Sequence, residues 1–254
     1  METVTIAGAR IEVLRIPASL PDRPTLLLLH EGLGCVALWK RFPHRLADET
    51  GCEVVAYSRR GYGMSDPLPL PWPILYMHGE AEFLSDVLDA LGLERIVAVG
   101  HSDGASIAII AAGSRRFPGL EALVLESPHV FTEEHGLTEI RKAGIAYRET
   151  DLRDRLAQYH DKVDVAFLGW HDAWTHSAFV AWNLEGFLPA IDVPVLLVQE
   201  ADDPYGTLAQ LDAIEARVAG PVERLVLAGD GHSPHRSQPG AVVAAIVGFL
   251  ETTE

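Results

Sequence analysis

A serine lies at the centre of Gly100–Gly104, which reads Gly-His-Ser-Asp-Gly. The apolar run Ile96–Val99 precedes this segment and the small-residue run Ala105–Ala112 follows it, which predicts a buried strand, a sharp turn and a helix. Flanking glycines allow the tight turn that exposes a serine hydroxyl above a sheet edge, and the helix N-terminus would direct N–H groups at an oxyanion. The pattern predicts nucleophilic catalysis by Ser102, although a plain strand-to-helix connection has similar features.

A serine hydroxyl is a weak nucleophile until a hydrogen-bonded imidazole accepts its proton, so the chain must supply partners. Carboxylates occur in Gln199–Tyr205, directly after the apolar run Pro194–Val198. Imidazoles occur in the turn-rich segment Ala228–His235, directly after Leu225–Leu227. The chain order of serine, acid and histidine, each after an expected strand, is the order found in one class of serine hydrolases.

The elements that must position these residues are apolar runs alternating with amphipathic ones. Continuous apolar runs are typical of strands covered on both faces. The expected strands are Val4–Ile6, Ile11–Leu14, Thr25–Leu29, Glu53–Tyr57, Ile96–Val99, Glu121–Leu125, Val195–Val198 and Val222–Leu227. The expected helices are Leu38–Asp48, His78–Leu91, Asp103–Ala112, Leu208–Val218 and Gly240–Leu250. This alternation predicts an α/β fold, with a mostly parallel central sheet flanked by helices.

Residues 129–188 interrupt the alternation with charged helical stretches and a cluster of aromatic side chains. Ligands bind at the carboxyl edge of open α/β sheets, so we predict that this segment is a helical cap inserted into a core of residues 1–128 and 189–254. Trp170 and Trp174 are spaced for one helix face and are candidates for the substrate pocket. Alternatively, such aromatics only attach the cap to the core.

The charge of the chain restricts its partners. The formal net charge is −16, with 36 Asp and Glu against 20 Lys and Arg, which argues against nucleic-acid and membrane-surface partners. Residues 1–6 lack the features of a signal peptide, and no apolar run approaches the roughly 20 residues that span a bilayer. Two cysteines, Cys35 and Cys52, are compatible with a reducing compartment. We expect a cytoplasmic protein, and its oligomeric state is not predicted.

The motifs resemble those of the α/β-hydrolase fold family over nearly the whole chain. The resemblance is carried by Ser102 in its turn, by His30–Gly34 after an apolar strand, by Arg60–Ser65, and by Gly231–His232. It implies catalysis without a cofactor or metal, in which Ser102 is the nucleophile and His232 is the base. A metal site is also not expected from spacing, because the histidines of the last loop lack a helical H-x-x-x-H arrangement.

Two assignments have competitors. In the family the acid lies three residues after a glycine that ends the strand. In this chain Glu200 occupies the position of that glycine. This favours Asp203, which would orient the imidazole, and leaves Asp202 as the alternative. The family's Gly-His pair favours His232 over His235 as the base.

The resemblance also implies two oxyanion donors, the backbone N–H groups of Asp103 and of a residue after His30. Glu31 takes the place of the family's usual glycine, so Gly32 is the second candidate. Asp103 and Glu31 are acids near the expected pocket. One interpretation is that one of these acids attracts a cationic substrate group, as in amino-acid ester hydrolases of this fold. The alternative is that Asp103 only stabilises the first turn of its helix and Glu31 only forms hydrogen bonds within its loop.

We therefore expect hydrolysis of a small carboxylic ester through an acyl-enzyme on Ser102. Haloalkane dehalogenation and epoxide hydrolysis are disfavoured, because family members with those activities use an aspartate nucleophile. The patterns leave open a lactone, a thioester, an amide, the C–C bond of a dienoate-type ring-cleavage product, and a low-turnover protein that senses a ligand. Each alternative has a small-molecule partner.

Overall fold

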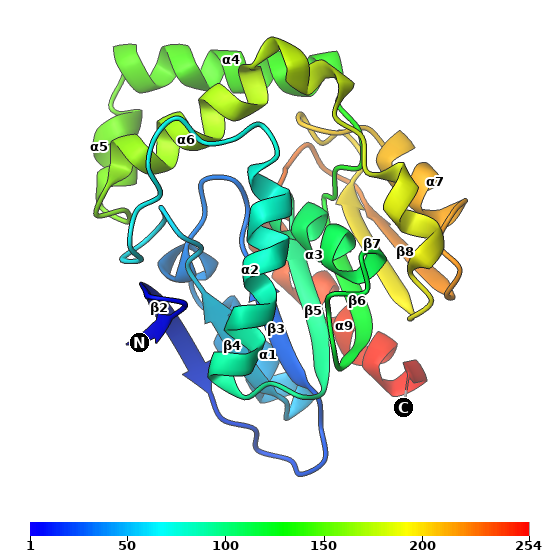
Figure 1. The fold of residues 1–254 in the computed structure, drawn as a ribbon. Coiled ribbons are helices and arrows are strands. Elements are labelled where there is room, and N and C mark those ends of the chain that lie inside the picture. Colours follow the sequence, from blue (N-terminus) through cyan, green and yellow to red (C-terminus); the bar gives the residue numbers. More distant parts are fainter. Residues whose placement is uncertain (254) are drawn as a thin grey trace.

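A computed structural model describes residues 1–253, which contain an eight-stranded sheet in the order β1-β2-β4-β3-β5-β6-β7-β8 (Figure 1). The strands are β1 (Glu2–Ile6), β2 (Ala9–Ile16), β3 (Thr25–Leu29), β4 (Glu53–Tyr57), β5 (Ile96–His101), β6 (Leu120–Glu126), β7 (Val195–Glu200) and β8 (Val222–Leu227). Strand β2 of the antiparallel hairpin β1–β2 pairs with β4, also in antiparallel fashion. The remaining neighbours, in the order β4, β3, β5, β6, β7 and β8, pair in parallel. The predicted fold class is confirmed.

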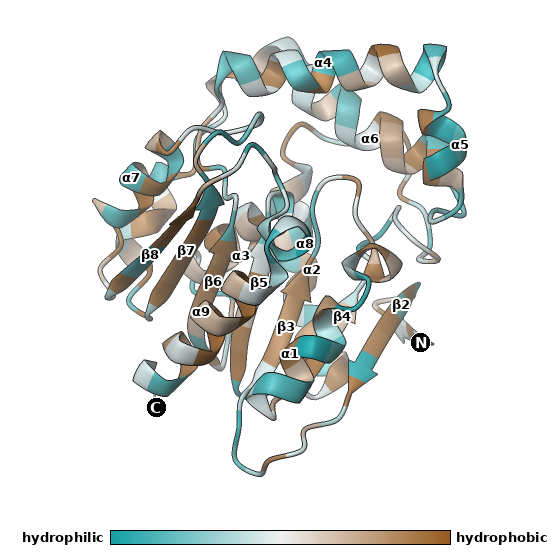
Figure 2. Cartoon of the chain, turned by 180° about the vertical axis from the view of Figure 1, so that it is seen from behind, coloured by the Kyte–Doolittle hydropathy of each residue, from teal (hydrophilic) through white to brown (hydrophobic). Residues whose placement is uncertain are grey.

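Helices cover both faces of the sheet (Figures 1 and 2). Helices α2 (Tyr76–Leu91), α3 (Asp103–Gly113) and α7 (Ala209–Glu215) pack on one face, and α1 (Phe42–Thr50) and α9 (Pro239–Thr253) pack on the other. Figure 2 shows apolar strands, and helices such as α1 and α7 that mix hydrophilic and hydrophobic residues. This arrangement explains why the central strands read as continuous apolar runs.

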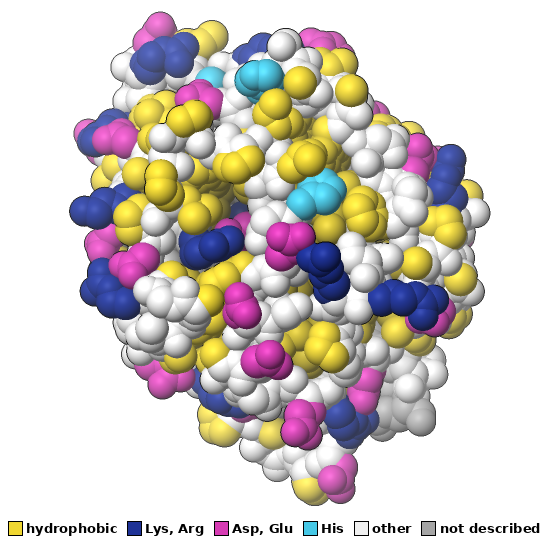
Figure 3. All heavy atoms as spheres, in the orientation of Figure 1, with side chains coloured by type: hydrophobic (Ala, Val, Ile, Leu, Met, Phe, Trp, Pro, Cys, Tyr) yellow, Lys and Arg dark blue, Asp and Glu magenta, His cyan; other side chains and the backbone are white. Residues whose placement is uncertain are grey.

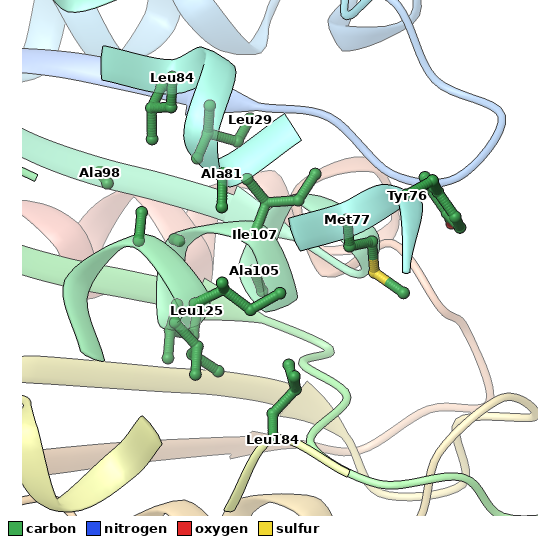
Figure 4. Close-up of a cluster of buried hydrophobic side chains, with 14 of the residues drawn as sticks. Leu29, Tyr76, Met77, Ala81, Leu84, Ala98, Ala105, Ile107, Leu125 and Leu184 are labelled. Atoms are coloured by element: carbon green, nitrogen blue, oxygen red, sulfur yellow. The ribbon is translucent and has the colours of Figure 1, made fainter. Parts of the chain in front are cut away.

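Strand β3 illustrates how alternation along a strand serves two cores. Leu27 and Leu29 belong to the apolar cluster under α2 and α3, whereas Leu26 and Leu28 belong to the cluster under α1 and α9. All four side chains are fully buried. Figure 4 shows the first cluster, where Leu29, Ala98 and Leu125 of the sheet meet Met77, Ala81, Leu84 and Ile107. The buried sheet fixes where β5 ends and thus where Ser102 stands.

Between β6 and β7 the chain forms α4 (Glu134–Glu149), α5 (Leu152–Ala157), α6 (Val163–Thr175) and the 3-10 helices η2 (Ser177–Ala181) and η3 (Glu185–Ala190). Helices α4, α5 and α6 lie beyond one edge of the sheet (Figure 1). Helices α4 and α6 carry part of the lining of a cavity that Ser102 also lines. The division into a core of residues 1–128 and 189–254 and a cap of residues 129–188 stays a prediction.

The prediction of one helix over Leu38–Asp48 is wrong for the first residues of that range. The chain instead forms the 3-10 helix η1 (Val36–Trp39), and Lys40 adopts φ 55° before α1 begins. A left-handed residue breaks the helical hydrogen-bond series, and Pro43 suits the first turn of a new helix because it has no N–H to satisfy. A further helix, α8 (Pro234–Ser237), follows the His232 loop and was not expected.

Charged side chains of both signs are interspersed on the face shown in Figure 3. Several surface arginines pair with acids, for example Arg10 with Asp66 and Arg95 with Glu121. The excess negative charge is therefore spread over this face rather than gathered in one patch. Within residues 1–253, no helix combines the length and apolarity needed to cross a bilayer.

Candidate active site

Ser102 occupies a strained turn between β5 and α3. Its φ is 54°, in the left-handed region that a non-glycine residue rarely adopts. A Cβ added to Gly104 would lie 2.0 Å from the carbonyl oxygen of Leu29, and one added to Gly100 would lie 2.6 Å from Cα of Ala105. Both glycines are therefore required for the close packing of α3 on the sheet, which holds Ser102 at the end of β5.

Ser102, His232 and Asp203 form one hydrogen-bonded series. The Ser102 hydroxyl lies 2.9 Å from Nε2 of His232, and Nδ1 of His232 lies 2.8 Å from Oδ2 of Asp203. A carboxylate only accepts, so Nδ1 carries the proton and Nε2 is free to accept the hydroxyl proton of the serine. The structure thus brings together three residues that the sequence analysis selected from separate loops.

Between the two candidate acids, Asp203 is the one in contact with the imidazole. Asp203 is buried, whereas Asp202 is exposed. Burial opposes ionisation of Asp203, but the bonded His232 imidazole outweighs it and the pKa of the carboxyl is lowered. Asp203 also accepts from the backbone N–H of Tyr205 at 2.8 Å. It is therefore anionic at neutral pH and fixes the orientation of His232.

His235 has a different environment. Its Nδ1 lies 2.6 Å from Oε2 of the buried Glu126, and its ring packs against Trp39 at a centroid distance of 4.7 Å. Among the described residues, the potential metal-ligating atoms of His101, Glu126 and His235 come within 4.8 Å of one another. However, two ligands of a tetrahedral zinc ion lie roughly 3.3 Å apart, so the 2.6 Å contact is a hydrogen bond rather than a pair of metal ligands.

The loop after β3 carries the second candidate oxyanion donor. Gly32 and Asp103 line the same cavity as Ser102 and His232. A Cβ added to Gly32 would lie 2.2 Å from Nε1 of Trp170, so the indole packs directly on this glycine. Gly32 and Asp103 thus both border the cavity beside Ser102, and their backbone N–H groups stay the predicted oxyanion donors.

Arg59 holds this loop in place and was missed by the sequence analysis. Its fully buried guanidinium donates to the backbone carbonyl oxygens of His30 and Glu31, the latter at 3.1 Å. The backbone N–H of Arg59 donates to Nε2 of His30 at 3.0 Å. Arg59 lies two residues after the end of β4, but the sequence carries no signal for which loop it contacts. The loop after β3 is therefore fixed by a residue beyond the end of a neighbouring strand.

The Asp103 carboxylate is engaged in a buried polar network. It accepts from the hydroxyl of Tyr76, which in turn accepts from Nε1 of Trp174 at 3.0 Å. It also lies 3.8 Å from the guanidinium of Arg59. Burial raises the pKa of Asp103 despite these partners. The Trp174 indole N–H is therefore occupied by protein, and the network links α6 to the start of α3.

The cavity beside Ser102 has a volume of about 120 Å³. Its wall is largely apolar, with Phe131, Leu137 and Ile140 beside both predicted tryptophans. Its lining residues are Glu31, Gly32, Leu33, Ser102, Asp103, His129, Phe131, Glu133, Gly136, Leu137, Ile140, Trp170, Trp174, Tyr205 and His232, which include no lysine or arginine. Burial lowers the pKa of His129 to about 3, so this imidazole is neutral at pH 7 and adds no positive charge to the cavity wall.

The acids at the cavity already have partners. Glu133 accepts from Gln210 and from the hydroxyl of Thr207, both at 2.7 Å. Glu31 lies 3.4 Å from Nδ1 of His101. The site therefore presents partnered carboxylates and apolar surface to a ligand.

Comparison with known proteins identifies the family. Residues 26–246 match the model of the Alpha/beta hydrolase family. The chain belongs to the alpha/beta hydrolase family. The resemblance inferred from the motifs is confirmed, and a hydrolase activity is supported.

The relatives of this hydrolase act on different bonds. It is 24% identical to Epoxide hydrolase A of Mycobacterium tuberculosis (strain ATCC 25618 / H37Rv), over 97% of this chain and 96% of that protein. It is 28% identical to Esterase YbfF of Escherichia coli (strain K12), over 78% of this chain and 82% of that protein. The crystal structure of a proline iminopeptidase from Mycobacterium smegmatis superposes on this chain with a TM-score of 0.77 and 21% identity. The match covers 99% of this chain and 98% of that chain. The choice of bond must be argued from the site.

Removing the Gly32 N–H tests its role in the oxyanion site. Gly32→Pro is expected to lower kcat about 100-fold relative to Gly32→Ala, since loss of one donor costs about 3 kcal/mol in other enzymes. Gly32→Ala is the matched control, because it keeps the N–H and adds the same Cβ beside Trp170. Steady-state kinetics on a p-nitrophenyl ester measure the ratio. Equal kcat values for the two variants would contradict the role.

Proposed function

We propose that this hydrolase cleaves a small, neutral carboxylic ester through an acyl-enzyme on Ser102. The observation that supports it best is the series Ser102, His232 and Asp203, bonded at 2.9 Å and 2.8 Å beside a cavity. No other group lining that cavity combines a hydroxyl with an acceptor imidazole oriented by a carboxylate among the described residues.

In this mechanism His232 accepts the Ser102 proton as Oγ bonds to the ester carbonyl carbon. The backbone N–H groups of Asp103 and Gly32 stabilise the oxyanion, and His232 then protonates the departing alcohol as the C–O bond breaks. Water, deprotonated by His232, attacks the acyl-enzyme and releases the acid, which restores the Ser102 hydroxyl. Asp203 holds the imidazole tautomer and stabilises its protonated form in both steps.

Serine as nucleophile favours acyl transfer over epoxide opening. Attack of a serine on an epoxide carbon would form an ether, which has no carbonyl for water to attack and would inactivate the enzyme. Attack on an ester forms a new ester, which the same imidazole can hydrolyse. The match to an epoxide hydrolase therefore supports the fold and the family rather than that reaction.

The charge of the cavity supports a neutral substrate. A dienoate-type C–C substrate carries a carboxylate, but no lysine or arginine lines the cavity in the described part of the chain. Arg59, the nearest guanidinium to Asp103, is fully buried and already bound to backbone carbonyls. An amine on the substrate is likewise not required, because the carboxylates of Asp103 and Glu31 have protein partners.

A panel of p-nitrophenyl esters tests the substrate class. We expect kcat/KM for a short neutral acyl ester to exceed that for the hemisuccinate at least ten-fold, because burying an unpaired carboxylate is costly. The α-amino acyl ester is expected to lie between them. A preference for the hemisuccinate would contradict the proposal. Thermal stabilisation by ligands with no turnover of any ester would instead favour a sensing protein.

A further inference from the structure

His101 is a buried imidazole that the proposed mechanism leaves without a role. It directly precedes Ser102 and is fully buried, with its ring 5.3 Å from the ring of His232 between centroids. Its Nε2 lies 2.6 Å from the backbone carbonyl oxygen of His232. A carbonyl oxygen only accepts, so Nε2 of His101 carries a proton. His101 thus holds the backbone of the residue that is proposed as the base.

The other nitrogen of His101 faces a carboxylate. Oε2 of Glu31 lies 3.4 Å from Nδ1, and the Glu31 side chain is 22% exposed. A Cβ on Gly34 would lie 2.3 Å from the same oxygen, so this glycine leaves room for the carboxylate. If His101 were neutral with its proton on Nε2, the Nδ1 lone pair would face Glu31. A proton on Nδ1 as well replaces that repulsion with an ion pair.

Both pKa shifts agree with such a pair. Burial alone would lower the pKa of His101 and raise that of Glu31, but the interaction between the two residues outweighs it in both. The Glu31 carboxylate, with a smaller effect of Glu126, raises the pKa of His101, and His101 in turn lowers the pKa of Glu31. The shifts favour the charged form of both partners.

We propose that Glu31 and His101 form a lasting ion pair that positions His232. The proposal rests on the proposed function, because His232 must act as the base. It connects the loops after β3 and β8 through the last residue of β5, in the series Glu31, His101 and the His232 carbonyl. It also gives a reason for an acid at the position where the family usually has glycine.

The role of the pair can be separated from that of the other charged groups around His101. The other titratable groups that face His101 are Glu126 from β6 and His235 from α8, which are bonded to each other at 2.6 Å. They are unchanged in a Glu31 variant, so its effect reports on the pair.

Glu31→Gln is expected to leave Nε2 protonated on His101 and to remove the proton from Nδ1. The contact that holds the His232 backbone through His101 is then weakened, and kcat is expected to fall about ten-fold with KM unchanged. Asp202→Asn removes one exposed negative charge near the same loops, should keep kcat, and is the matched control. An unchanged kcat in Glu31→Gln would overturn the positioning of His232 by the pair.

Nitrogen-15 NMR of the imidazoles tests the ion pair without measuring turnover. At pH 7.5 we expect both ring nitrogens of His101 to carry protons, and only Nε2 in Glu31→Gln. A single proton on His101 in the unaltered protein would overturn the proposal, even if ester hydrolysis is established. Protons on both nitrogens in a protein that hydrolyses no ester would instead refute the proposed function and keep the pair.

Discussion

Ser102→Ala is expected to abolish the burst of p-nitrophenol and to lower kcat about 10⁶-fold, the size of loss seen for the nucleophile of a serine protease. The hydroxyl is the only part of the site that forms a bond to the substrate in the proposed mechanism, and alanine leaves the oxyanion donors in place. Pre-steady-state release of p-nitrophenol measures both quantities. The fold should be unaffected, because alanine is smaller and the strained turn depends on Gly100 and Gly104.

Ser114→Ala is a suitable control for this experiment. Ser114 is exposed at the other end of α3, so its loss should leave kcat within about two-fold. A burst of normal size in Ser102→Ala would contradict a covalent role for Ser102. It would direct attention to another nucleophile or to direct attack by water.

Asp203→Asn is expected to lower kcat about 10⁴-fold, as the equivalent change does in a well-studied serine protease. An asparagine can donate to Nδ1 of His232, which stabilises the tautomer with the proton on Nε2. That tautomer cannot accept the Ser102 proton, so the imidazole is held in the wrong state although its position is kept. Steady-state kinetics and the pH profile of kcat measure the loss.

Asp202→Asn makes the identical chemical change one residue earlier. Asp202 is exposed, whereas Asp203 is bonded to His232 at 2.8 Å, so the Asp202 variant should retain kcat within about two-fold. The reverse order of effects would assign the acid to Asp202 and contradict the geometry of the loop after β7.

The residues that could be predicted from the sequence are those whose position depends on local structure. The apolar run Thr25–Leu29 is a strand in the structure because both of its faces are covered. The turn at Ser102 is defined by its own neighbours, Gly100 and Gly104. The family pattern implied by the resemblance favoured Asp203 over Asp202, and Asp203 is the acid that contacts His232.

What the sequence missed depends on contacts between distant segments. Arg59 meets His30 and Asp103, and Tyr76 meets Asp103 and Trp174, and no periodicity reports such pairs. Packing of these side chains is decided only when the strand ends and α6 come together.

Glu31 shows the same limit. Its residue type suggested either a ligand contact or a contact within its own loop, but its carboxylate faces His101 on another strand end. The break at Lys40 was missed for a local reason, because a left-handed lysine has no sequence signal of its own.

The most direct test of the account is the intact mass of the protein, quenched in acid within milliseconds of mixing with p-nitrophenyl butyrate. The account predicts an increase equal to one butyryl group, located by peptide mapping on Ser102 and absent from Ser102→Ala. Multiple turnover with no adduct at any quench time, or an adduct on a different residue, would contradict acyl-enzyme catalysis by Ser102.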